Sequence, residues 1–200
     1  SRVSTVARRH SSITALSKAS TRETSAPVRI LGIDPGSRIT GYGIIETTGS
    51  RSACVVYGRI QCDDVPLPQR LLHILGELGK VIGQYAPQET AIEVVFVKMN
   101  VSSALVLGQA RGAAICALAQ AGLPVAEYAP SRIKSTIVGH GRADKKQIQH
   151  MVRVLLDLPD EPPTDAADAL AVALCHAHLR AAPALARIGT ARRRARRWRL

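Results

Sequence analysis

The sequence predicts an α/β fold in which a mixed, five-stranded sheet is flanked by helices. Two observations support this class. Apolar stretches at residues 28–33, 40–49 and 52–62 come first and are separated by turn residues, which predicts an antiparallel meander. Helix and strand patterns then alternate over the rest of the chain. An order of this kind is typical of a sheet whose faces are covered by helices.

Each element after the meander is marked by a local pattern. Leucines at helical spacing predict the first helix, and uninterrupted apolar runs predict the remaining strands. Gly122 is expected to end the second helix, and the Pro-rich stretch 159–163 to form the hinge before the last one. In order, the expected segments are a helix over 66–87, a strand over 90–96, a helix over 100–122, a strand over 124–130, and helices over 131–138, 145–157 and 164–182.

The charge distribution divides the chain into a body and two basic ends. The net charge of +12 comes from residues 1–27, which carry +4, and residues 180–200, which carry +8. The first 27 residues are rich in Ser, Thr and Arg, so we expect a disordered basic extension there. We expect one folded domain over 28–180 and a disordered Arg-rich tail over 181–200. Basic ends of this kind attract polyanions such as nucleic acids.

Apolar runs and cysteines indicate the environment of the protein. No uninterrupted apolar run approaches the roughly 18 residues of a membrane span, so we expect a soluble protein without a membrane partner. The four cysteines are far apart in sequence and each has apolar neighbours. We therefore expect buried free thiols, a reducing compartment and no zinc site. These cysteines are Cys54, Cys62, Cys116 and Cys175.

Four acidic residues stand at unusual places. Asp165 and Asp168 open the last predicted helix, where carboxylates complement the helix dipole and where Thr164 or Asp165 can act as the N-cap. Asp34 directly follows the first apolar strand, a place that also suits a turn-capping residue. Glu93 interrupts the strand AIEVVF, where its side chain could point to solvent, although its neighbours are apolar and an unpaired buried charge would be costly. Each acid therefore has a structural explanation of its own.

One metal site would explain all four acids together. The first and fourth strands of such a sheet are commonly neighbours, which would bring Asp34 beside Glu93. The two aspartates of the last helix share one face and can point to the same spot. Converging carboxylates repel unless hard divalent cations lie between them, and oxygen-only ligation favours Mg²⁺ or Mn²⁺. Two such ions about 4 Å apart activate a water molecule and stabilise the leaving oxygen of a phosphodiester.

Five sequence blocks follow one another between about Val28 and His178: RILGIDPGSRITGYGII, AIEVVFVKMN, LGQARG, VGHGRADKKQIQHMV and TDAADALAVA. In this order and at these separations, they closely resemble the RuvC family of bacterial Holliday-junction resolvases. The resemblance implies a ribonuclease H-like fold and a Mg²⁺-dependent endodeoxyribonuclease that acts in recombination and DNA repair. The expected enzyme is a homodimer that binds a four-way DNA junction. It nicks two strands of like polarity and leaves 5′-phosphate and 3′-hydroxyl ends.

The same resemblance implies cofactors, a partner and a location. Two Mg²⁺ ions per subunit are expected, with Mn²⁺ as a substitute. The expected partner is the RuvA–RuvB branch-migration complex, and the expected location is the bacterial cytoplasm. Residues 1–27 depart from the family, whose members begin near the first strand, and their Arg- and Ser-rich composition also suits an organellar transit peptide. By motif, the family's catalytic metal ligands fall on Asp34, Glu93, Asp165 and Asp168.

Other positions carry over from the resemblance as candidate DNA contacts. Lys134 and Lys145 match basic residues near the scissile phosphate, where an ammonium group would neutralise charge in the transition state. Lys146 and Arg142, in the same block as Lys145, are expected to contact DNA as well. Phe96 matches an aromatic residue that inserts at the junction, where it can stack on a base. A solvated lysine and a core phenylalanine are the structural alternatives.

Three other classes of protein share part of this pattern. An actin- or Hsp70-like ATPase also opens with a strand ending in G-I-D-x-G, but it needs a second domain and a second phosphate loop, which this chain does not offer. Another ribonuclease H-like nuclease, acting on RNA, would have the same carboxylates but not the blocks LGQARG and HGRADKKQ. A junction-binding protein without catalysis would not need all four acids.

Overall fold

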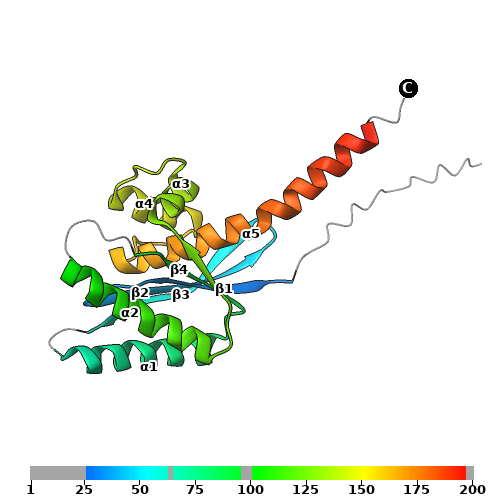
Figure 1. Ribbon diagram of the computed structural model, residues 1–200. Helices are drawn as coiled ribbons and strands as arrows, with labels where there is room; N and C mark the ends of the chain where they lie inside the picture. Colours follow the sequence, from blue (N-terminus) through cyan, green and yellow to red (C-terminus); the bar gives the residue numbers. More distant parts are fainter. Residues whose placement is uncertain (1–25, 63–64, 96–100, 197–200) are drawn as a thin grey trace, which may run out of the picture.

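The computed structural model describes residues 26–62, 65–95 and 101–196, with side chains described as far as Arg180 (Figure 1). The expected segments are confirmed within these ranges, and most of their ends agree within three residues. The elements are β1 (Val28–Asp34), β2 (Ile39–Thr48), β3 (Arg51–Gln61), α1 (Leu67–Tyr85), β4 (Glu89–Glu93), α2 (Val101–Gln120), β5 (Val125–Tyr128), α3 (Pro130–Val138), α4 (Lys145–Leu155) and α5 (Thr164–Arg196).

The described strands form one mixed sheet in the order β3-β2-β1-β4-β5. β1, β2 and β3 are antiparallel neighbours, which confirms the expected meander. β4 pairs with β1 in parallel and β5 pairs with β4 in parallel, so β1 and β4 are adjacent as expected. Because parallel strands end at the same edge of the sheet, the carboxyl ends of β1 and β4 lie side by side.

Glycines let α5 lie directly on the strands of one face. A Cβ atom at Gly32 of β1 would collide with the carbonyl oxygen of Ala169, and one at Gly41 of β2 would collide with the carbonyl oxygen of Asp165. The helix backbone therefore contacts the strand backbones without an intervening side chain. This close packing fixes the first turn of α5 above the end of β1.

The other face of the sheet is covered by α1 and α2 (Figure 1). α2 is long and apolar enough to cross a membrane by length and composition alone. Polar residues, including Arg111, interrupt its apolar pattern, so no uninterrupted run of that length is present. Ala110, Ala114 and Leu118 of α2 are buried in the core against the sheet. Cys116 is exposed on the same helix, so the expectation of a buried thiol was wrong there.

The structure describes most of the C-terminal basic end but not the N-terminal one. α5 continues to Arg196, so the backbone is helical through most of the stretch for which the sequence predicts a disordered tail. The Ala, Leu and Arg residues of this stretch favour helix, and they extend the helix past Pro183. The N-terminal extension up to residue 25 and Phe96 lie outside the described residues.

Candidate active site

Asp34 and Glu93 are the last residues of two adjacent parallel strands. Ile33 of β1 pairs with Ile92 of β4, so the two acids follow at the same level of the sheet. Alternation along each strand directs both side chains to the face that α5 covers. A cavity of about 200 Å³ opens at this edge of the sheet, lined by Asp34, Pro35, Glu93, Val94, Val95, Leu107 and Pro130.

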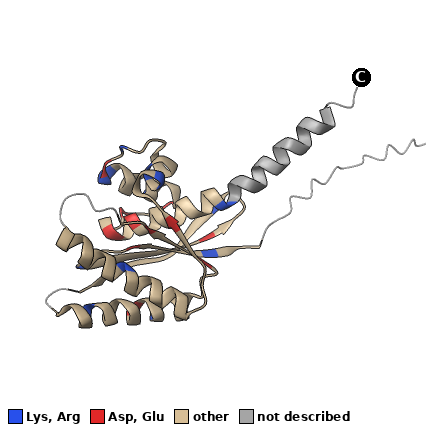
Figure 2. Ribbon diagram, in the orientation of Figure 1, with Lys and Arg blue, Asp and Glu red and all other residues tan. Residues whose placement is uncertain are grey.

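α5 brings the other two acids to the same edge of the sheet. Thr164 begins the helix after the Pro-rich stretch, and Asp165 lies in its first turn. The negative charges of Glu93, Asp168 and Asp165 each raise the pKa of Asp34, which requires all four carboxyl groups to lie close together. In Figure 2, acidic residues colour the start of α5 beside the basic residues of α3 and α4. The four acids therefore lie near one another, as the sequence predicts.

Burial and mutual repulsion make the carboxyl groups of Asp34, Glu93 and Asp168 hard to ionise. Burial is the main reason that the pKa of Asp34 rises to about 8, followed by the charges of Glu93 and Asp168. The pKa of Glu93 rises to about 7, again mainly through burial and then through Asp168. Burial also raises the pKa of Asp168, although Lys145 opposes that rise. A group of acids with pKa values pushed upward in this way needs cations to ionise together at neutral pH.

The side chain of Lys145 lies beside the acids. Lys145 Nζ lies 3.6 Å from Asp168 Oδ2, and the Lys145 side chain is 73% exposed. Within the described part of the chain, no three His, Cys, Asp or Glu side chains are arranged as a metal site that is ready to bind. The acids therefore approach one another closely enough to interact through their charges, but they would have to draw together to share a cation.

The predicted basic residues occupy different environments. Lys134 of α3 donates a hydrogen bond from Nζ to the carbonyl oxygen of Ala143 at 2.8 Å, and its charge lowers the pKa of Glu93. Lys145 opens α4 and reaches Asp168. Lys146 and Arg142 are exposed near the same helix start. Lys134 and Lys145 thus lie beside the acids, whereas Lys146 and Arg142 lie on the exposed surface next to them.

Arg111 belongs to the site but was missed by sequence reasoning. It donates a hydrogen bond from Nε to the carbonyl oxygen of Glu93 at 3.3 Å. It also forms an ion pair with Glu127, with 2.6 Å between Nη2 and Oε2. The block LGQARG contains this arginine, so a signal was present, but nothing in the sequence shows which carbonyl it reaches.

Comparisons with known proteins identify the family of this chain. The family model described as "Crossover junction endodeoxyribonuclease RuvC" matches residues 30–176. The protein of that name from Alkalilimnicola ehrlichii is 55% identical over 150 residues, which cover 75% of this chain and 91% of the relative. The one from Halorhodospira halophila is 55% identical over 166 residues, which cover 82% and 99%.

Solved structures confirm the expected ribonuclease H-like fold. The structure of T. thermophilus RuvC in complex with Holliday junction substrate matches with a TM-score of 0.73 and 31% identity, covering 78% of this chain and 96% of that one. The yeast mitochondrial Holliday junction resolvase Ydc2 matches in fold, with a TM-score of 0.53 and 9% identity. From the family model and these relatives, the chain belongs to the RuvC family of crossover junction endodeoxyribonucleases.

Proposed function

We propose that this protein is a structure-selective endonuclease that resolves four-way DNA junctions. It makes paired nicks in strands of like polarity and leaves 5′-phosphate and 3′-hydroxyl ends, in recombination and DNA repair. The observation that carries the proposal is the convergence of four acids from β1, β4 and α5, with pKa values raised to about 8 for Asp34 and about 7 for Glu93. Membership of the RuvC family, and the junction bound to the T. thermophilus relative, support the substrate.

The four acids suit a pair of Mg²⁺ ions, with Mn²⁺ as a substitute. All the donors are carboxylate oxygens, which hard divalent cations prefer. Bound there, the metal would supply an activated water molecule and charge neutralisation at the phosphodiester. The proposed ligands are Asp34, Glu93, Asp165 and Asp168.

The chain itself contributes positioning and counter-charge. Glycines at the helix–sheet contact hold Asp165 above Asp34, so two of the ligands are fixed by backbone packing. Lys145 can leave Asp168 for a phosphate oxygen, because its long side chain is mostly exposed. Lys134 is held by the carbonyl of Ala143, which directs its ammonium group to one side of the acids. Lys146, Arg142 and Phe96 extend this contact to the DNA.

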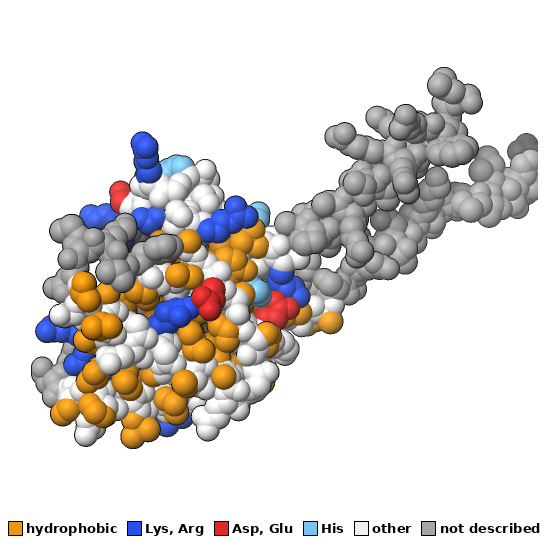
Figure 3. Space-filling view, in the orientation of Figure 1, with side chains coloured by type: hydrophobic (Ala, Val, Ile, Leu, Met, Phe, Trp, Pro, Cys, Tyr) orange, Lys and Arg blue, Asp and Glu red, His pale blue; other side chains and the backbone are white. Residues whose placement is uncertain are grey.

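Paired nicking needs two sites, and we propose that a homodimer provides them. Exposed apolar side chains on α1 and α2 support a second copy as the occupant: Val101 is 69% exposed, Leu105 63% and Leu72 70%. Figure 3 shows hydrophobic side chains gathered on this face of the molecule. The RuvA–RuvB branch-migration complex is the proposed partner, and the bacterial cytoplasm the proposed location. The basic ends at residues 1–27 and 181–200 would add contacts to DNA.

A cleavage assay tests the substrate and the metal together. A labelled four-way junction, a linear duplex and an RNA–DNA hybrid are each incubated with the protein in Mg²⁺ and in EDTA. Paired, ligatable nicks in the junction that require Mg²⁺ are expected. Cutting of the hybrid in preference to the junction would keep the carboxylate site but reject the substrate. Junction binding without nicking would reject catalysis.

A further inference from the structure

The short edge strand β5 contacts helices on both faces of the sheet, near the sheet edge where Asp34 and Glu93 lie. Glu127 pairs with Ile92 and Tyr128 pairs with Glu93 in the β4–β5 register. Successive residues of a strand point to opposite faces, so Glu127 faces α2 and Tyr128 faces α5. Each of the two side chains meets a partner from the helix on its own face. The strand that lies beside Glu93 is therefore held from both sides.

On the α2 face, Arg111 connects β5 to the end of β4. Its guanidinium lies 2.6 Å from Glu127 as an ion pair that lacks hydrogen-bond geometry, and its Nε donates to the carbonyl oxygen of Glu93. β4 ends at Glu93, so this carbonyl is at the end of the ladder and takes its partner from a side chain. The bond fixes the peptide plane that follows Glu93. The Arg111 side chain is only 20% exposed, so solvent competes weakly for it.

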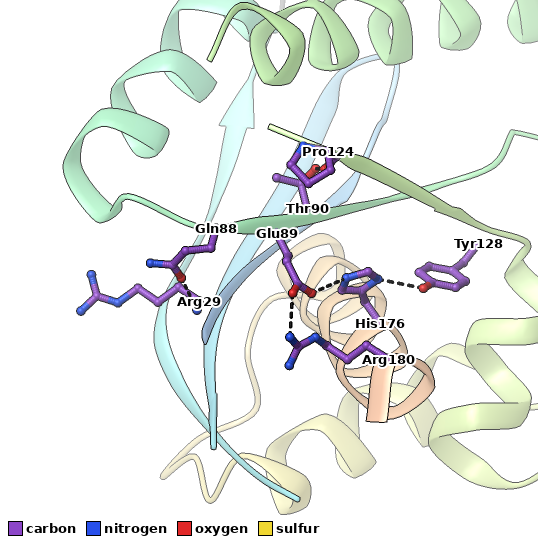
Figure 4. A network of polar contacts seen from close by, with 8 residues as sticks. All are labelled: Arg29, Gln88, Glu89, Thr90, Pro124, Tyr128, His176 and Arg180. Atoms are coloured by element: carbon purple, nitrogen blue, oxygen red, sulfur yellow. Dashed lines mark hydrogen bonds and ion pairs between the residues drawn. The ribbon is translucent and has the colours of Figure 1, made fainter. Parts of the chain in front are cut away.

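On the α5 face, a chain of polar contacts connects Tyr128 to the start of β4 (Figure 4). The hydroxyl of Tyr128 lies 2.8 Å from Nδ1 of His176, and Nε2 of His176 lies 2.9 Å from Glu89. A carboxylate can only accept, so Nε2 donates to Glu89, and in the neutral imidazole Nδ1 then accepts from the tyrosine hydroxyl. Arg180 binds the other oxygen of Glu89 at 2.7 Å. These contacts attach α5, which carries Asp168, to both β4 and β5.

We propose that Arg111 and His176 are positioning residues that hold Glu93 in place against the repulsion of the neighbouring acids. The proposal rests on the nuclease function proposed above. Asp34 ends the neighbouring strand at the same level as Glu93, and carboxylates brought together in this way repel one another. Arg111 acts directly on the backbone of Glu93, and His176 acts through Tyr128. Without these contacts the end of β4 can turn away from Asp34, and the acids hold a cation less well.

A positioning role differs measurably from a contribution to stability. Glu127, the partner of Arg111, is 52% exposed and can be solvated by water when the arginine is replaced, so the loss of Arg111 is expected to leave the protein folded. Residues that orient metal ligands affect metal affinity or activity by roughly 10- to 100-fold. A large fall in kcat without a matching change in KM for the junction is therefore the expected signature.

Arg29 provides a matched control. Like Arg111, it contacts one carboxylate and one backbone carbonyl. Its Nε lies 3.1 Å from Glu46, and its Nη1 lies 2.9 Å from the carbonyl oxygen of Tyr85. It lies near the start of β1, at the end of the strand opposite to Asp34. Replacing it removes the same types of contact without touching the acids.

The experiment compares Arg111→Gln, Arg111→Lys, His176→Phe and Arg29→Gln with the wild type. We measure kcat and KM on a four-way junction, and Mn²⁺ binding by electron paramagnetic resonance without DNA. Arg111→Gln is expected to lower kcat by roughly 10- to 100-fold, to change KM less than about threefold and to weaken Mn²⁺ binding. Arg111→Lys is expected to recover part of the loss. His176→Phe should cause a smaller loss, because it acts through Tyr128.

Two outcomes would overturn the proposal. One is wild-type kcat and Mn²⁺ binding in Arg111→Gln, and the other is an equal loss of both in Arg29→Gln. Wild-type behaviour of His176→Phe would remove His176 from the proposal. If the wild-type protein does not nick junctions, the nuclease function fails, but Mn²⁺ binding still compares Arg111→Gln with Arg29→Gln. The two failures are thus distinguishable.

Discussion

Lys145 and Asp168 form the ion pair closest to the proposed chemistry, with 3.6 Å between Nζ and Oδ2. The lysine is the first residue of α4 and the aspartate lies in α5, so the contact joins the α3–α4 unit to the helix that carries Asp165 and Asp168. The lysine lowers the pKa of all three acids whose pKa is raised, Asp34, Glu93 and Asp168. Together with Lys134, which lowers the pKa of Glu93 and Asp168, it partly offsets the repulsion among the acids.

Replacing Lys145 by Gln is expected to reduce junction cleavage by roughly 100-fold while leaving the fold intact, because the developing phosphate charge loses a cation. Lys146→Gln is the matched control, since Lys146 is the next residue of the same helix and is exposed. Single-turnover nicking rates measure the difference. Equal effects of the two substitutions would show that the helix contributes only general positive charge.

Asp34→Asn and Asp168→Asn are expected to abolish cleavage but to retain junction affinity. Each removes a ligand charge from the centre of the acid cluster, and removing a negative charge does not weaken attraction to phosphates. Asp160→Asn serves as the control, because Asp160 is exposed in the stretch before α5. Gel-shift affinity in Ca²⁺ and nicking in Mg²⁺ are measured in parallel. Near-wild-type nicking by either site variant would contradict the metal assignment.

Without metal, the stability of the folded protein is expected to fall as pH rises from about 4 to about 8. Asp34 has an ordinary pKa of 3.8 and a folded pKa of about 8, so the folded state binds more protons than the unfolded state in this window. The stabilisation is complete below pH 3.8 and is lost as pH rises through 8. Melting temperatures in EDTA across this range provide the measurement.

The same titration offers an internal check with Asp34→Asn. The variant cannot ionise at position 34, so its melting temperature at pH 8 in EDTA is expected to exceed that of the wild type by roughly 5 °C. At pH 4 the two proteins should differ little, because Asp34 is then largely protonated in the folded state. Parallel pH profiles for the two proteins would contradict the raised pKa of Asp34.

Gly41→Ala is expected to destabilise the protein by roughly 1–3 kcal/mol and to reduce cleavage, because the new methyl group collides with the carbonyl oxygen of Asp165. Gly76→Ala is the control, since a Cβ at that helical position meets no atom within 4 Å and should stabilise slightly. Denaturant melts and nicking rates report the two effects. A neutral Gly41→Ala would show that α5 can shift without loss.

Removing residues 181–200 is expected to weaken junction binding and to reduce its dependence on salt concentration, because eight arginines lie between residues 180 and 200 and seven of them are removed. Preference for a junction over a linear duplex should change less. Binding isotherms at several salt concentrations give the slope. An unchanged slope would mean that the tail does not contact phosphates.

Much of the fold could be predicted because its signals are local. Apolar runs, glycine turns and leucine spacing marked each described strand and helix, and the rule for parallel neighbours predicted that Asp34 and Glu93 would meet. Segment ends were less certain: the predicted strand over 90–96 ends at Glu93, so Glu93 lies at the strand end instead of its interior. The sequence pattern predicted that the acids would cluster, but it did not predict the contacts around them.

The contacts that support the acids could not be predicted, since they join residues far apart in sequence. Arg111 lies 18 residues from Glu93, and His176 lies 87 residues from Glu89. Only the relative placement of α2, α5 and the sheet brings them together. In the sequence alone, Arg111 and His176 are ordinary polar residues within apolar helices.

The glycine contact between α5 and the sheet has a mechanical consequence. Side chains normally separate a helix from a sheet, and they can change rotamer to accommodate a small displacement. At Gly32 and Gly41 that layer is missing, so the first turns of α5 have no room to move toward the sheet. The helix also continues well past the edge of the sheet (Figure 1). A displacement of its far end along the helix axis would therefore be transmitted to Asp165 and Asp168.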